Sequence, residues 1–62
     1  MTNENDDRVR KLRHDIANPL AALLAEAQLA LLNAERLDPE TLNGLKEIER
    51  LALRMRDILK TS

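Results

Sequence analysis

The sequence predicts an all-α protein: an antiparallel two-helix hairpin that pairs with a second copy to form a four-helix bundle. In both halves of the 62-residue chain, apolar residues recur at steps of three and four, the spacing of one face of an α-helix. Cysteine and aromatic residues are absent, although 44% of the residues are hydrophobic. A chain this short buries that surplus most simply by self-association, because it has no disulfide to stabilise a small core.

The first predicted helix covers about residues 6–35. Its apolar row consists of Val9, Leu12, Ile16, Leu20, Leu23, Ala27, Ala30 and Ala34. The row is widened by Leu24, Leu29, Leu31 and Leu32. Apolar residues therefore extend almost around the second half of this helix, and we expect that half to be buried on more than one side.

The predicted turn covers about residues 36–38, and the second predicted helix covers about residues 39–60. Asp38 suits the N-cap, and Pro39 suits the first helical position. The apolar row of this helix consists of Leu42, Leu45, Ile48, Ala52, Met55 and Leu59, with Leu51 and Ile58 beside it. Gly44 either permits close packing near the turn or is simply tolerated, at a cost of about 1 kcal/mol relative to Ala.

The short connection predicts that the two helices lie antiparallel. A second helix of about 21 residues is about 31 Å long at 1.5 Å per residue. His14 should therefore lie level with residues 58–60, and residues 5–12 should project beyond the hairpin. A single hairpin would expose more apolar surface than soluble monomers tolerate, which favours a homodimer.

The charge balance limits the partners. Ten basic and eleven acidic residues give a net charge of −1, so we expect no binding of nucleic acid. No segment approaches the roughly 18 apolar residues of a membrane span, and the acidic N-terminus is not a signal peptide. We expect a cytoplasmic chain without direct membrane contact, either free or as part of a membrane-bound receptor.

A lone histidine without cysteine predicts no metal site. The predicted solvated face consists of Lys46, Glu47, Glu49, Arg50, Arg54, Arg56 and Asp57.

Residues 14–20, HDIANPL, carry the candidate site. Because Ile16 belongs to the apolar row, His14 should point about 200° away from it, with Asn18 on the same outward face. An exposed imidazole can act as a nucleophile, and the adjacent Asp15 carboxylate can fix the ring tautomer and stabilise developing positive charge. Asn18 can orient a water molecule or a phosphoryl oxygen near the ring.

Pro19 provides further evidence for a site here, through its effect on the helix backbone. Proline inside a helix costs about 3 kcal/mol, and here it removes the amide that would bond to the carbonyl of Asp15. A helix of leucine and alanine has little packing reason to accept that cost, which indicates a functional site. Taken one by one, the residues also have plainer interpretations: a surface histidine, two common polar helix residues, and a proline that starts a new helix.

The heptapeptide resembles the H box of bacterial sensor histidine kinases, whose pattern is His, Glu or Asp, an aliphatic residue, any residue, Asn or Thr, Pro and Leu. The matching positions are His14, Asp15, Ile16, Asn18, Pro19 and Leu20. The hairpin over roughly residues 6–60 is similar to the dimerisation and histidine-phosphotransfer domain of that family. Many family members carry an aromatic residue shortly before the histidine, and this chain has none.

The resemblance implies that His14 accepts the γ-phosphoryl group of ATP and passes it to an aspartate of a response-regulator receiver domain. It implies that Asp15 is the general base, that Asn18 positions phosphate or hydrolytic water, and that Pro19 kinks the helix. The regulator would dock below His14, against residues 20–28 and nearby parts of the second helix. ATP and magnesium would bind a separate catalytic domain, so this chain would hold no cofactor and would be inactive alone.

Two other interpretations stay open. The chain can be a purely structural dimerisation hairpin with an incidental histidine, for which an ordinary helix former in place of Pro19 would be expected. It can also be a pseudokinase helix pair that signals through helix motion. That alternative shares every residue seen here, so only the catalytic domain would distinguish it.

Overall fold

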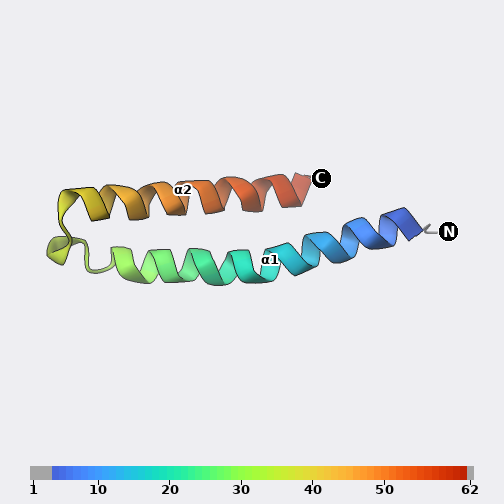
Figure 1. Ribbon diagram of the computed structural model, residues 1–62, viewed down its shortest axis with the longest axis horizontal. Coiled ribbons are helices and arrows are strands. Elements are labelled where there is room, and N and C mark those ends of the chain that lie inside the picture. The colour runs from blue at the N-terminus through green and yellow to red at the C-terminus, as the bar shows by residue number, and fades with distance from the viewer. Residues whose placement is uncertain (1–3, 62) are drawn as a thin grey trace.

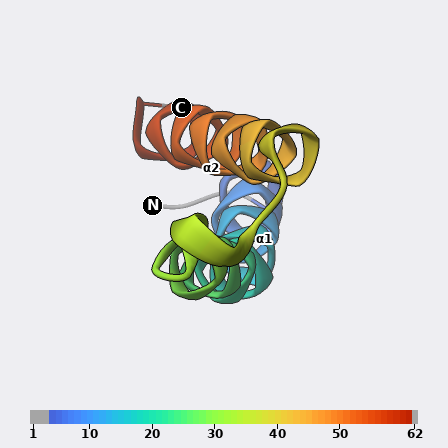
Figure 2. The same ribbon diagram turned by 90° about the vertical axis from the view of Figure 1, so that its left-hand side faces the viewer.

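The computed structural model describes residues 4–61 and consists of two long helices that lie antiparallel and side by side (Figures 1 and 2). Helix α1 spans Glu4–Leu31, a short 3₁₀ helix η1 spans Ala34–Arg36, and helix α2 spans Pro39–Thr61. The described residues contain no strand, so the predicted all-α hairpin is confirmed. The outermost residues of the predicted domain, 1–3 and 62, lie outside the described part.

The first helix ends earlier than the apolar pattern predicts. α1 stops at Leu31 rather than near residue 35. The amides of Leu32 and Asn33 donate to carbonyl oxygens three residues back, each at 3.2 Å, and the 3₁₀ helix follows directly. These shorter-range bonds tighten the chain and satisfy carbonyls that an ending helix would leave unpaired. The connection between the helices therefore covers residues 32–38, not only 36–38.

Helix α2 begins with a side-chain cap, as predicted. The backbone amide of Thr41 donates to Oδ2 of Asp38 at 3.1 Å, and the Thr41 hydroxyl donates to Oδ1 at 2.5 Å. The cap satisfies one of the free amides of the first helical turn. Both hydrogen bonds lower the pKa of the Asp38 carboxyl below its ordinary value, and the bond from the hydroxyl has the larger effect.

The contact between the helices is made by a small set of side chains. Leu20 and Leu24 of α1 pack on Ala52 of α2, which is only 2% exposed. Leu53 and Leu59 pack against this cluster. An alanine at the centre lets the two backbones approach, while burial of each leucine contributes about 1.5–3 kcal/mol. The core is therefore narrow, and it determines which side of each helix faces inward.

The predicted apolar rows are wider than this contact. Six large side chains, all between 42% and 60% exposed, form what we call the apolar face: Leu12, Leu23, Ile48, Leu51, Met55 and Ile58. Leu12, Leu23, Ile48 and Met55 belong to the predicted apolar rows, and the single hairpin leaves them exposed, as expected from the width of those rows. One neighbouring helix covers only part of so wide a row.

The exposed side chains of the two helices lie on the same side of the hairpin. At about 100° per residue, Leu12 and Leu23 are rotated about 80° and 60° from Leu20 in one sense. Met55 and Leu51 are rotated about 60° and 100° from Ala52 in that same sense. In antiparallel neighbours, equal senses of rotation away from the shared contact lead to the same side. The apolar face is therefore one continuous surface.

Gly44 lies inside α2, and a Cβ built on it would have nothing within 4 Å. Of the two interpretations of this glycine, the single hairpin agrees with a tolerated residue and not with close packing between α1 and α2. Within the described chain, neither helix has the combined length and apolar character needed to cross a membrane.

The Asp38 cap predicts a pH-dependent stability. Because the folded-state pKa lies below the unfolded-state pKa, the cap stabilises fully above the unfolded value, and this contribution is lost as pH falls through the folded value. Asp38→Asn keeps a capping oxygen that does not titrate. We expect wild type to lose stability relative to Asp38→Asn below about pH 4, measured by urea unfolding with circular dichroism. A constant difference from about pH 6 to pH 2 would contradict this linkage.

Candidate functional site

All four candidate site residues lie on α1 and are exposed: His14, Asp15, Asn18 and Pro19. His14 and Asn18 are one turn apart and share a face, separated by about 40° of rotation. His14 is rotated about 120° from Leu20, which faces the core. The imidazole is thus accessible to another protein, as the sequence predicts.

The structure does not bring Asp15 onto the imidazole. Within residues 4–61, the side chains of His14 and Asp15 take part in no hydrogen bond or ion pair. Consecutive helix residues diverge by about 100°, so a carboxylate at this position reaches the ring only after a change of rotamer. Both ring nitrogens of His14 are consequently open to a reaction partner.

Pro19 lies in the interior of α1, which continues to Leu31 beyond it. The interpretation of this proline as the start of a new helix is therefore wrong. Since proline has no amide hydrogen, the carbonyl of Asp15 lacks its helical donor, which loosens the turn that carries the motif. Figure 1 shows that α1 bends in its cyan section, the part of the colour bar to which the motif belongs. Proline is one of the few established causes of such a bend.

The proline also marks a boundary in packing. The buried residues of α1 are Leu20, Leu24 and Ala27, and all three follow Pro19. Before it, the described residues of α1 include none that is buried, and only Arg13 and Ile16 are half-buried. His14 therefore belongs to the part of the helix that the hairpin holds least firmly.

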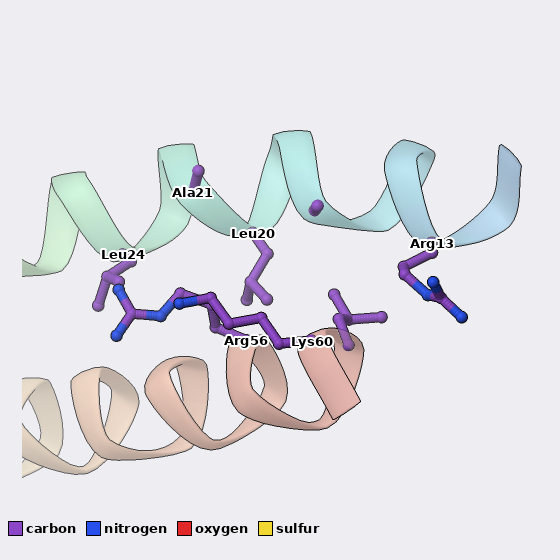
Figure 3. Close-up of a pocket in the computed structure, with 8 residues that line it drawn as sticks. Arg13, Leu20, Ala21, Leu24, Arg56 and Lys60 are labelled. Atoms are coloured by element: carbon purple, nitrogen blue, oxygen red, sulfur yellow. The ribbon is translucent and has the colours of Figure 1, made fainter. Parts of the chain in front are cut away.

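A groove lies between the helices beside His14, with a volume of about 420 Å³. We call it the basic groove. It is lined by Arg13, Ala17, Leu20, Ala21 and Leu24 of α1 and by Arg56, Leu59 and Lys60 of α2 (Figure 3). Because Arg13 shares the groove with Leu59 and Lys60, the residue next to His14 lies level with the last turns of α2. This agrees with the predicted register, and Figure 1 shows the N-terminal part of α1 projecting beyond α2.

The basic groove and the apolar face lie on opposite sides of the hairpin. Ala17 and Ala21 are rotated about 60° and 100° from Leu20, in the opposite sense to Leu12 and Leu23. Arg56 and Lys60 are rotated from Ala52 in the opposite sense to Met55. Pairing of two hairpins through their apolar faces would therefore leave the basic groove accessible.

The sequence pattern does not predict this groove. It places Arg56 on the solvated face and gives no role to Arg13 or Lys60. A usable signal was present: Ala17 and Ala21 are small residues one turn apart, and Arg56 and Lys60 are basic residues one turn apart. What the pattern lacked was the relative rotation of the two helices, which brings these pairs together.

The predicted charged face is exposed except at Glu49, which is half-buried, so the prediction of a solvated side chain is wrong for that residue. Arg50 forms an ion pair with Glu47 on the exposed side of α2. This interaction lowers the pKa of Glu47 and raises that of Arg50. Both side chains are more than half exposed, so the pair contributes little to stability.

Comparison with known proteins gives no match: no family model, no curated protein and no solved structure is significantly similar to this chain. Within the described residues, no group of three or more His, Cys, Asp or Glu side chains could hold a metal ion. A functional assignment therefore depends on the motif, its exposure and its place in the hairpin.

Replacement of Pro19 tests whether the motif is strained. Pro19→Ala restores the missing amide at an exposed position and should raise the free energy of unfolding by up to about 3 kcal/mol. Asn18→Ala, the matched exposed neighbour, should change it by well under about 1 kcal/mol. Thermal unfolding followed by circular dichroism measures both. A lower melting temperature for Pro19→Ala would show that the proline stabilises the native bend.

Proposed function

We propose that this chain is the phospho-accepting and dimerisation module of a two-component sensor histidine kinase. The observation that supports this most is an exposed His14, five residues before an interior Pro19, on a helix that continues through both. His14 takes the γ-phosphoryl group of ATP, which a separate catalytic domain binds with magnesium, and relays it to an aspartate of a response regulator. Such a module acts in the cytoplasm, where ATP and the regulator are present.

In the first step, a ring nitrogen of His14 attacks the γ-phosphorus. The bond from that phosphorus to the bridging oxygen breaks, ADP leaves, and the proton of the attacked imidazole passes to a base. Asp15 is the adjacent carboxylate and is free to turn toward the ring, since it has no other partner within residues 4–61. The carboxylate also stabilises the positive charge on the ring during attack.

In the second step, a carboxylate oxygen of the regulator attacks the phosphorus and the nitrogen–phosphorus bond breaks. Accessibility of His14 supports this step, because a second protein must reach the ring from outside. Asn18 lies on the same face one turn away, where its amide can orient the water that competes with the regulator in phosphatase activity. The regulator would contact the surface below His14 that includes the basic groove.

The second part of the proposal is a homodimer that forms a four-helix bundle. The apolar face is its support: six large apolar side chains on one side of a hairpin exceed what a monomer usually leaves in water. Two copies related by a two-fold axis bury this surface in a shared core. Both copies then present His14 outward, because it lies on neither the contact between the helices nor the apolar face.

A purely structural dimerisation hairpin and a pseudokinase helix pair are the competing functions. Exposure of His14 alone fits all three. The interior position of Pro19 favours the phospho-accepting module over the structural hairpin, since a structural helix gains nothing from a missing hydrogen bond.

Phosphorylation tests the chemistry directly. When the chain is incubated with the ATP-binding domain of its kinase and labelled ATP, we expect a phosphate that is labile in acid and stable in base. His14→Gln should abolish the label, whereas Asp15→Asn should slow it by about 10²–10⁴-fold, the usual size of a general-base effect. Label that persists in His14→Gln would exclude the assignment, and an unchanged rate in Asp15→Asn would exclude that residue as base.

Ile48→Glu tests the dimer. Ile48 is 42% exposed in the single hairpin, so a monomer would tolerate the charge, whereas a buried apolar interface would not. We expect sedimentation equilibrium to show a dimer for wild type and a monomer or unfolded chain for Ile48→Glu. Asn43→Glu, with the same charge change on the outer side of α2, should remain dimeric. A wild-type chain that is folded and monomeric at micromolar concentration would refute the bundle.

A further inference from the structure

We propose that the basic groove is a binding site for a single-chain anionic amphiphile, a molecule with one carboxylate or phosphate head and an unbranched apolar tail. The site is defined by two features that occur together: an apolar floor between the helices and three basic side chains around it. This binding requires no chemistry at His14, so its test is independent of the test of the proposed phosphotransfer.

Five of the eight residues that line the groove are apolar. Leu20 and Leu24 point toward α2 from α1 (Figure 3). Leu59 of α2 also lines the groove, as do Ala17 and Ala21 of α1, whose small side chains take up little of its space. Between Arg13 and Leu24 the groove follows α1 for about 16 Å. A narrow, elongated apolar surface of this kind suits an extended hydrocarbon tail better than a compact ring system.

The charges around the floor are of one sign. Arg13, Arg56 and Lys60 line the groove and no acidic residue does. Within residues 4–61, none of these three side chains has an ion-pair partner. Arg56 and Lys60 are like charges at i and i+4, a spacing that is repulsive in an isolated helix. An anion bound between them relieves this repulsion.

The two ends of the groove differ, and this orients the ligand. The side chains of Arg56 and Lys60 run together below Leu20 and Leu24, whereas Arg13 stands at the other end (Figure 3). Nε of Arg13 is shielded from solvent and has no hydrogen-bond partner in the described chain. We place the anionic head at the Arg56–Lys60 pair, where two cations lie together, and the tail along Leu24 and Leu20, ending short of Arg13, because an apolar chain cannot pair with its Nε.

The ligand can reach this groove in the proposed dimer as well as in the monomer, because the apolar face lies on the opposite side. At about 420 Å³, the groove is also too small to seat a two-tailed lipid. A free single-chain amphiphile is therefore the occupant that the charges and the dimensions favour together, and a membrane surface is not.

A titration followed by two-dimensional NMR of the ¹⁵N-labelled full chain tests the site. Decanoate and decyl phosphate, each below its micelle concentration, should shift the amides of groove residues saturably, with one ligand per chain. Acetate supplies the head without the tail, and decyltrimethylammonium supplies the tail with the opposite charge. Neither should give these shifts at the same concentration. Shifts centred on Leu51 and Met55, equal shifts from the cationic amphiphile, or binding only to anionic vesicles would each overturn the proposal.

Variants locate the head group. Arg56→Gln and Lys60→Gln should each weaken decanoate binding about fivefold, the effect of losing one exposed charge pair. Arg54→Gln is the matched control, because Arg54 lies on the same helix and does not line the groove. It should bind as wild type does, and His14→Gln should too. Unchanged affinity in both groove variants, with circular dichroism showing them folded, would refute the site.

Discussion

The packing of Leu20 and Leu24 on Ala52 determines the rest of the hairpin. It is the only place among the described residues where large side chains of one helix are buried against the other, and so it sets the rotation of both. Once Leu20 faces inward, helical periodicity directs His14 about 120° away, into solvent. The accessible imidazole is therefore a consequence of the core and needs no packing of its own.

The same rotation separates the remaining surface into two sides with different chemistry. On one side lie the six exposed side chains of the apolar face, and on the other lies the groove with Arg13, Arg56 and Lys60. Contact of the first side with water is unfavourable, and pairing of two such sides would remove it. The second side carries charges that favour contact with water or an anion. A hairpin with only one buried alanine on α2 is a weak monomer, which makes pairing of the apolar sides physically consistent with its small core.

The sequence was sufficient for the fold class, the antiparallel arrangement, the Asp38 cap and the exposure of His14, because each depends on local periodicity or on local hydrogen bonding. It was insufficient for features that depend on the rotation of the two helices relative to each other. The apolar rows included Leu12 and Met55 but did not show which of their members contact the neighbouring helix, because one partner covers only part of a row about 100° wide. The end of α1 at Leu31 was also missed, since no glycine or proline marks it.

Pro19 connects the core to the motif. All buried residues of α1 follow it, so the missing hydrogen bond falls where the packed segment meets the unpacked one. Few buried contacts and a broken hydrogen-bond ladder both lower the free energy needed to bend or open a helix locally. In the middle of the core, the same proline would cost stability and change little else, because its neighbours would hold the turn in place. At this boundary it lowers the cost of changing the angle of the segment that carries His14 while Leu20 and Leu24 stay packed on α2. The proposed phosphotransfer, in which His14 would meet two different partner domains, would use that freedom.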